Sequence, residues 1–309
     1  MVNFYKSIDG RINEIEQFEQ GCWINIVDPD EDEIENMVDL LSIETDFIKA
    51  ALDDEETSRI EEDDNGNKLI IIDIPMAEKE EQSIVYCTVP LAFIITESSI
   101  VTVCLKENSI IKEFAAGMAK DIKANQKTRF LFQMFFKVAT RYLQYLKQID
   151  KLSGEIEKQL HKSMRNKELI QLLELEKSLV YFTTSLRGNE VTMKKLLRGR
   201  FVKLYEEDED LLEDVLIEVG QAIEMANIYS NILSGTMDAF ASIISNNLNI
   251  VMKFMTSVTI VMAVPTIISS IYGMNVDNLP YDHLWWFPVA LSVVAMGVVV
   301  YALQRKNMF

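Results

Sequence analysis

Two long stretches without a charged side chain, close to the C-terminus, constrain this 309-residue chain more than any other feature. No residue from Phe254 to Ile271 is charged, and a second uncharged run extends from Trp285 to Leu303. Each run is close to the ~20 apolar residues that a helix needs to cross the hydrocarbon core of a membrane. Core helices of soluble proteins rarely stay apolar on all sides for so long. The runs therefore predict two transmembrane helices, at about 254–271 and 285–303.

The charges that flank these runs indicate their orientation. Lys253 precedes the first run, Arg305 and Lys306 follow the second, and the connector 272–284 has no lysine or arginine. Because positive charge stays on the cytoplasmic side, we expect both termini in the cytoplasm and the connector outside. The N-terminal sequence also lacks the apolar segment of a signal peptide. The predicted location is the cell membrane, with the lipid bilayer as a partner.

Composition argues against several classes of function. The chain has 48 acidic and 30 basic residues, a net charge of −18, so we expect no nucleic-acid partner. Two histidines (His161 and His283) and three scattered cysteines (Cys22, Cys87 and Cys104) offer little material for a zinc site. There is no P-loop and no pairing of a nucleophile with a base, so we do not expect an enzyme.

Residues 1–125 predict an α+β cytosolic domain, a mixed sheet with helices. Helices are expected at 31–41, with Asp30 as N-cap, and at 44–54. Asn65-Gly66 is typical of a hairpin turn. Short apolar, β-branched runs predict strands at 21–28 and 67–77, and two or three more within 83–106, with turns near Pro90 and Glu97–Ser99.

From about residue 108 onwards, apolar residues recur every three or four positions, which is the period of a helix. This pattern predicts helices at about 126–163 and 168–197, and one very long helix from about 208 into the membrane. A helix of that length would extend about 90 Å. The predicted organisation is a cytosolic domain at 1–125, a helical hairpin and stalk at 126–250, and a transmembrane domain at 251–309.

One face of the long helix collects polar and small residues. Polar groups at membrane depth pack against protein or line a water-filled path. Packing between helices through small residues is the alternative explanation, but polar residues continue the same line below the membrane, which favours a conduit. The stripe comprises Asp238, Ser242, Ser245, Asn249, Met252, Met255, Thr259, Ala263, Thr266, Ser270 and Gly273.

Two spans cannot enclose a hole, so a pore requires several copies around an axis. Met252 and Met255 would then form apolar collars, which can close a pore by dewetting. Asn275 would form a ring of carboxamides at the outer mouth, which suits a hard, hydrated cation such as Mg²⁺. Asp277 and Asp282 would raise the local concentration of cations. Gly273 would let the backbone turn close to the axis.

The motif Tyr272-Gly273-Met274-Asn275 at the end of the first span, followed by a second terminal span, resembles the CorA family of divalent-cation channels. The pair Met252-Lys253 at the inner membrane edge adds to this resemblance. It implies a funnel-shaped homopentamer whose long helices line a pore for passive Mg²⁺ influx, driven by the membrane potential.

The resemblance also implies roles for individual residues. Asp214 would bind regulatory Mg²⁺ between subunits, and Asp238 would form an acidic ring below the gate. The selectivity filter would comprise Gly273, Met274 and Asn275, and the pore and gate would comprise Asn249, Met252, Met255, Thr259 and Thr266. The candidate metal-binding residues are Asn275, Asp214, Asp277 and Asp282.

Acidic residues cluster at 28–35, 53–56, 61–64 and 206–214. Such clusters are usually solvated surfaces, but in an assembly of copies they would repel one another. Mg²⁺ bound between carboxylates of adjacent subunits would relieve the repulsion and hold the ring closed. Two alternatives stay open: transport of Co²⁺, Ni²⁺ or Zn²⁺ on the same scaffold, with His283 as a possible softer ligand, and a non-conducting membrane-anchored Mg²⁺ sensor or scaffold.

Overall fold

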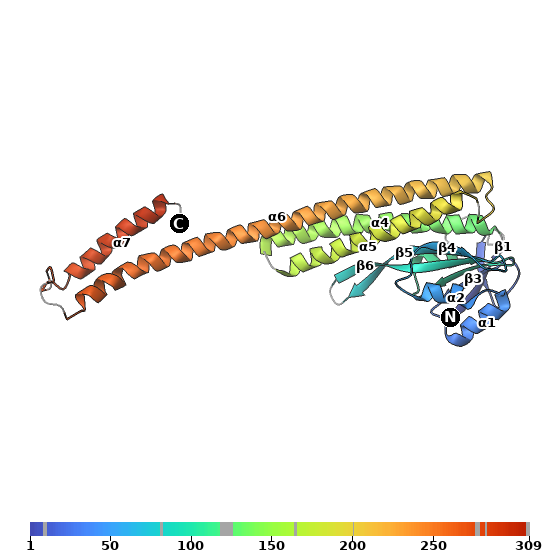
Figure 1. The fold of residues 1–309 in the computed structure, drawn as a ribbon, viewed down its shortest axis with the longest axis horizontal. Coiled ribbons are helices and arrows are strands. Elements are labelled where there is room, and N and C mark those ends of the chain that lie inside the picture. The colour runs from blue at the N-terminus through green and yellow to red at the C-terminus, as the bar shows by residue number, and fades with distance from the viewer. Residues whose placement is uncertain are drawn as a thin grey trace. The chain divides into compact units, whose positions relative to one another are not determined.

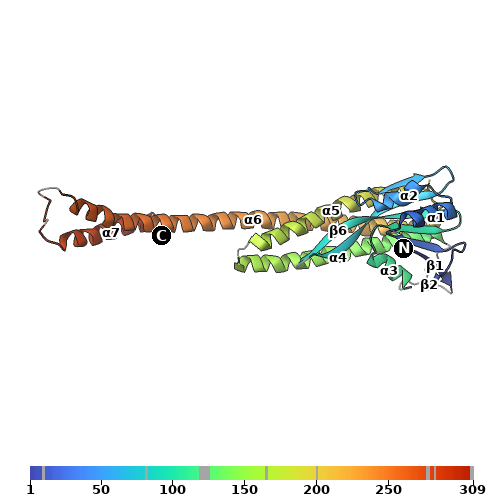
Figure 2. The same ribbon diagram turned by 90° about the horizontal axis from the view of Figure 1, so that it is seen from below.

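The computed structural model describes residues 1–8, 11–80, 83–117, 126–163, 166–199, 201–275, 279–281 and 283–306. The chain divides into two units, Met1–Gly235 and Thr236–Phe309. The long helix α6 (Glu206–Tyr272) contributes to both units, and each is described below by itself. Figures 1 and 2 show the ribbon from two directions.

A seven-stranded mixed sheet is the centre of the first unit, in the order β2-β1-β3-β7-β6-β5-β4. β3 and β7 run parallel, and the other described neighbours are antiparallel. The hairpin β1–β2, where the sequence indicated no strands, was missed. The strands are β1 (Val2–Ile8), β2 (Arg11–Ile15), β3 (Trp23–Val27), β4 (Arg59–Glu62), β5 (Lys68–Glu80), β6 (Ser83–Ile95) and β7 (Ile100–Cys104).

The predicted turn at Pro90 is wrong, because β6 passes through this residue without a break. Pro90 stands opposite Asp73 on β5. The backbone N–H and C=O of Asp73 both hydrogen-bond to the Asn189 side chain. Asp73 therefore needs no hydrogen bond from Pro90, which has no N–H to donate. On the other side of β6, the pairing with β7 ends at Leu91 and Cys104, before it reaches Pro90. The turn predicted at 97–99 does connect β6 to β7.

Short helices cover one face of the sheet (Figure 1). α1 (Glu31–Leu41) has the predicted bounds, and Asp30 and Glu33 form a reciprocal capping box at its start. α2 (Thr45–Lys49) and the 3₁₀-helix η1 (Ala50–Leu52) fill the predicted segment 44–54. Gly66 has a φ of +83° in the predicted turn between β4 and β5. Met37, Phe47 and other buried side chains join the short helices to the sheet in one apolar core.

Two long helices, α4 (Lys127–Ser163) and α5 (Asn166–Leu197), cover the opposite face (Figures 1 and 2). Their ends lie within two residues of those predicted. Aromatic residues make the contact: the ring of Phe135 on α4 meets Phe93 edge-on at 5.4 Å, and Tyr142 meets Phe182 at 5.1 Å. All four are nearly or fully buried, so an aromatic layer fixes both helices on the sheet.

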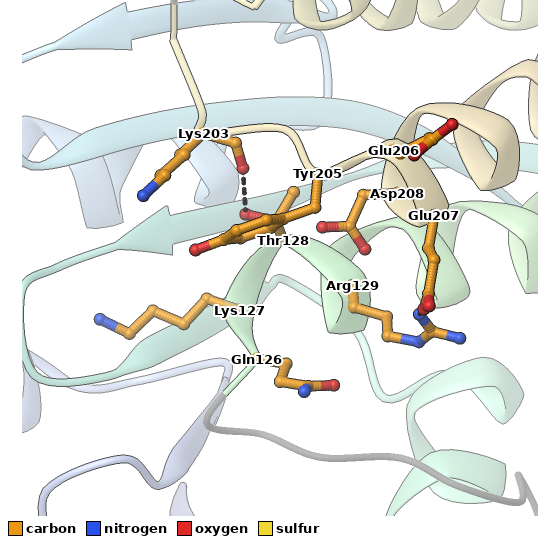
Figure 3. A pocket seen from close by; sticks show the side chains of 9 residues that line it. All are labelled: Gln126, Lys127, Thr128, Arg129, Lys203, Tyr205, Glu206, Glu207 and Asp208. Carbon is orange, nitrogen blue, oxygen red and sulfur yellow. Dashed lines mark hydrogen bonds and ion pairs between the residues drawn. The ribbon is translucent and has the colours of Figure 1, made fainter.

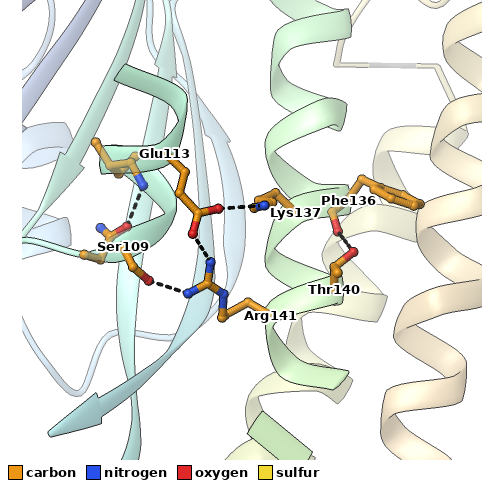
Figure 4. A network of polar contacts seen from close by, with 8 residues as sticks. Ser109, Glu113, Phe136, Lys137, Thr140 and Arg141 are labelled. Carbon is orange, nitrogen blue, oxygen red and sulfur yellow. Dashed lines mark hydrogen bonds and ion pairs between the residues drawn. The ribbon is translucent and has the colours of Figure 1, made fainter. Parts of the chain in front are cut away.

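A charged network attaches α3 (Ser109–Ala115) to α4 (Figure 4). The Glu113 carboxylate lies 2.6 Å from Lys137 Nζ and 2.5 Å from an Arg141 nitrogen, and Arg141 also donates to Ser109 Oγ at 2.7 Å. Burial favours the neutral form of Glu113, but these hydrogen bonds outweigh it and lower the pKa of the carboxyl group. The network therefore favours the ionised state.

The second unit consists of the C-terminal part of α6 and the helix α7 (Phe287–Arg305), which returns alongside it (Figures 1 and 2). Both helices are long and apolar enough to cross a membrane. α6 ends one residue beyond the first predicted span, and α7 is displaced by two residues from the second. This unit carries the residues that the sequence places along a pore.

Candidate ion pathway

α6 and α7 meet along one face of each helix. On α6, Ser257 is fully buried, and Val261, Val264 and Ile268 on the same face are partly buried. On α7, Ser292 retains 7% of its exposure. Both serine hydroxyls donate to the carbonyl four residues earlier, to Lys253 at 2.8 Å and Pro288 at 2.7 Å. Both hydroxyls are thus satisfied within their own helices and need no partner across the contact.

The polar stripe lies on the other side of α6. Successive residues of an α-helix are separated by about 100°, which places the stripe about 170° away from the face that meets α7. Met252 and Met255 are 58% and 57% exposed in the single chain, and Thr259 is also exposed. Packing between the two spans of one chain therefore does not explain why polar residues collect on this face.

The threonines of the stripe are compatible with an apolar surrounding and with water. Thr259 donates its hydroxyl to Met255 O at 2.8 Å, and Thr266 donates to Met262 O at 3.2 Å. Each donor is thus satisfied within the helix, while the oxygen lone pairs stay free to accept from water or to face a cation. Asn249, Ser242, Ser245 and Asp238 extend the exposed line along α6.

An aromatic cluster holds the end of α6 against the start of α7. The Tyr272 hydroxyl donates to Pro280 O at 3.1 Å, across the connector. The ring of Phe287 lies 6.1 Å from Tyr272 and 4.9 Å from Tyr281. The sequence showed that Tyr272 precedes the motif, but it held no signal for a partner eight residues further on. This hydrogen bond connects the two ends of the loop that carries Gly273, Met274 and Asn275.

Gly273 does not adopt a left-handed conformation. Its N–H donates to Ser269 O at 2.9 Å, and a Cβ at this position would lie 3.1 Å from the same oxygen. Close approach to the last turn of α6 therefore explains the glycine here. Met274 and Asn275 follow it in exposed positions. Asp277 and Asp282 lie outside the described residues.

Asp214, the predicted regulatory residue, and Asp238, the predicted acidic ring, are both exposed on α6, Asp214 in the first unit and Asp238 in the second. Within the described part of the chain, no group of three His, Cys, Asp or Glu side chains is placed to hold a metal ion.

The first unit also has a cavity of about 700 Å³ where α4 and α6 begin (Figure 3). Two of its three cations contact oxygens of the chain: Lys127 donates to Thr96 O and Glu97 O, both at 2.7 Å, and Arg129 lies 2.7 Å from Glu207. The third, Lys203, lies over the Tyr205 ring at 5.3 Å. Burial lowers the pKa of Lys127. Acidic side chains balance these cations, so the cavity is not a strong anion site.

A mixed-sheet domain is followed by one long helix, whose C-terminal part is a candidate membrane span, and by a second candidate span, α7; this arrangement defines a class of two-span membrane proteins. The chain belongs to the CorA-like Mg²⁺ transporter family, whose model matches residues 18–305.

Known relatives agree in sequence and in fold. The chain is 28% identical to the cobalt/magnesium transport protein CorA of Methanocaldococcus jannaschii, over 92% of this chain and 90% of that protein. It is 32% identical to the protein of the same name from Thermotoga maritima, over 42% of each chain. The complete structure of the M. jannaschii CorA magnesium transporter matches with a TM-score of 0.84 and 25% identity, covering 100% of this chain and 99% of that one.

Proposed function

We propose that this protein is a Mg²⁺ channel in the cell membrane, which admits the ion passively through the axis of a homopentamer. One observation carries the proposal: the polar stripe of α6 is exposed and lies on the side opposite to the contact with α7. In a ring of copies, α7 would face lipid while the stripe surrounds a water-filled path. The funnel-shaped pentamer expected from the family satisfies this arrangement.

The filter in this proposal is the ring of Gly273, Met274 and Asn275. Carboxamide and peptide oxygens would hold Mg²⁺ through its hydration shell, because this ion loses its water reluctantly. Asp277 and Asp282 would attract cations to the outer mouth. Below the filter, Thr266, Thr259, Met255, Met252 and Asn249 line the path, and the methionine collars form the gate.

The gate closes when cytosolic Mg²⁺ binds between subunits. Asp214 supplies one carboxylate, and a neighbouring copy supplies others. Loss of the ion restores repulsion between the acidic first units and opens the pore, since the ion stabilises the closed state more than the open one. Asp214→Ala should therefore weaken inhibition of the current by internal Mg²⁺, measured in excised membrane patches. Unchanged inhibition would remove Asp214 from the mechanism.

Conduction and ion choice are tested together in proteoliposomes that contain the purified full-length chain. We expect Mg²⁺ uptake that depends on the membrane potential and is only weakly reduced by Zn²⁺. The native mass in detergent should equal five copies. Preferred uptake of Co²⁺, Ni²⁺ or Zn²⁺ would favour the transition-metal alternative, in which His283 is the candidate ligand. Absence of uptake, with the pentamer intact, would favour a sensor or scaffold.

A further inference from the structure

The second unit carries three cations, Lys253, Arg305 and Lys306, all exposed. Their nearest side-chain carboxylates in the sequence are Asp238, 15 residues before Lys253, and Asp282, 23 residues before Arg305. Ion pairs between successive turns of a helix are therefore not available to them. Residues 236–309 also contain three aspartates, so the whole net charge of −18 belongs to residues 1–235.

The pairing of α6 with α7 brings these cations to one end of the unit. Ser257 and Leu303, at 0% and 8% exposure, mark the end of the contact farthest from the connector. Lys253 lies four residues before Ser257, and its carbonyl accepts the Ser257 hydroxyl at 2.8 Å. Lys306 lies three residues after Leu303. At 1.5 Å per residue, both lysines lie within about 6 Å of this end, measured along the helices.

Their directions around the helices also agree. At about 100° per residue, Lys253 lies about 40° from Ser257 and about 120° from the centre of the polar stripe. Lys306 lies about 60° from the direction of Leu303, while Arg305 points to the outer side of α7. The two lysines therefore lie beside the line of contact between α6 and α7, which we call the seam, and away from the proposed pore wall.

The surface beside the lysines is apolar. On α6, Ile260 and Ile267 lie within about 40° of the direction of Lys253 and are 40% and 58% exposed. On α7, Val299 and Ala302 lie within about 40° of the direction of Lys306. A phosphodiester headgroup at the two ammonium groups would leave its acyl chains along these side chains, at the level where a span meets the membrane surface. The acidic first unit repels anions, so complementary charge is concentrated at this end.

We propose that the seam between α6 and α7 binds an anionic phospholipid, such as phosphatidylglycerol, through Lys253 and Lys306. The site depends on the two membrane spans but not on ion conduction, and it is distinct from the filter, the gate and Asp214. The bound headgroup neutralises the two lysines and fixes the seam at its end.

Native mass spectrometry of the full-length protein tests this proposal. The detergent-solubilised protein is titrated with phosphatidylglycerol or with phosphatidylcholine of the same acyl chains, and the bound lipids are counted. The double variant Lys253→Gln/Lys306→Gln should bind phosphatidylglycerol about 25-fold more weakly, about fivefold for each cation near the membrane surface. Its retention of phosphatidylcholine should not change.

Two controls separate headgroup recognition from other effects of the substitutions. Lys151→Gln/Lys158→Gln makes the same change of charge at exposed positions on α4 and should bind phosphatidylglycerol like the parent. Lys253→Arg/Lys306→Arg keeps both charges and should also bind like the parent. Equal loss in the α4 variant, loss in the arginine variant, or unchanged binding by the glutamine variant would overturn the proposal. Because ion flux is not measured, none of these outcomes affects the proposed transport function.

Discussion

The two units bury their side chains to very different extents. The first unit encloses an apolar core on both faces of its sheet, including Trp23, Phe93, Phe135 and Tyr142, which are all fully buried. In the second unit, the buried side chains among the described residues are Phe240, Ser257, Ser292 and Leu303. Only 6% and 11% of the residues in the most apolar stretches of α6 and α7 are buried within the chain. The first unit therefore encloses a core of its own, whereas the second leaves most of its side chains exposed, as the proposed assembly in a membrane requires.

The exposed surface of the second unit differs in chemistry from one side to the other. Large apolar side chains such as Met262, Val294 and Tyr301 are 65–68% exposed, which suits contact with acyl chains. Trp285 and Trp286 stand before α7, where an interfacial aromatic belt is expected. The polar stripe, by contrast, is unsuited to lipid. A change in the first unit should thus alter folding, and a change on the stripe should alter transport.

Asn189→Ala should have the largest effect, on the stability of the first unit. The Asn189 side chain accepts from Ser58 Oγ and from Asp73 N, both at 2.8 Å, and donates to Asp73 O at 2.7 Å. β4 begins at Arg59, which pairs with Ile71, so Asp73 lies on the part of β5 that extends past β4. Its backbone groups bond to Asn189 there instead of to a strand. Leaving these buried groups without partners should cost about 3 kcal/mol.

Thermal unfolding of the solubilised full-length protein, followed by circular dichroism, measures this loss. Lys177→Ala, at an exposed position of the same helix, is the matched control and should change the midpoint little. An unchanged midpoint for Asn189→Ala would show that the hydrogen bonds of Asn189 do not contribute to the stability of the first unit.

Asn275→Ala tests the second unit and should reduce Mg²⁺ uptake about 10- to 100-fold. The substitution removes the carboxamide that would contact the hydrated ion, and hydrogen bonds to charged groups are worth about 1.5–3 kcal/mol. Because Asn275 is exposed in the single chain, the unfolding midpoint should stay the same. Uptake into proteoliposomes is the measurement.

Asn247→Ala is the matched control, since this exposed asparagine lies on α6 about 160° from Ser245 and Asn249 of the stripe. Equal uptake by Asn275→Ala and the parent would contradict the filter assignment and favour a non-conducting scaffold.

Asp73→Asn should stabilise the first unit at pH 7, because it removes a buried charge. Burial is the main cause that raises the pKa of Asp73; the hydrogen bond with Ser185 opposes it, and the charge of Glu56 adds to it. A carboxyl group with a raised pKa stabilises the fold when protonated. That contribution is complete below its ordinary pKa of 3.8 and is lost as the pH rises through the folded-state value.

Unfolding midpoints of parent and variant, measured from pH 4 to pH 8, should therefore diverge as the pH rises. A less stable variant at pH 7 would show that the Asp73 charge is compensated within the first unit.

Local patterns predicted most of the helices of the molecule, for a physical reason. Periodicity and capping residues are local signals, so α1, α4, α5 and both candidate spans were found within two residues of their ends. The straight passage of Pro90 depends on a neighbour far away in the sequence, whereas the pairs of the missed β1–β2 hairpin are local, within residues 2–15. The distant neighbour is Asn189, 116 residues from Asp73.

The same limit applies to the ion pathway. Helix geometry places the stripe residues on one face of α6, but the sequence did not indicate which face would meet α7. The roles of Asp214, Asp238 and Asn275 stay predictions, because they depend on contacts between copies.

Tyr272→Phe should have the smallest effect on transport, and it tests a single hydrogen bond of the second unit. It removes the hydroxyl that donates to Pro280 O and keeps the ring beside Phe287. One neutral hydrogen bond is worth about 0.5–1.5 kcal/mol, so Mg²⁺ uptake should fall about two- to tenfold while the first unit unfolds unchanged. Tyr281→Phe, in the same aromatic cluster, is the matched control, because its hydroxyl makes no hydrogen bond among the described residues. An equal fall in both variants would indicate that the aromatic cluster, rather than the Tyr272 hydrogen bond, positions the filter.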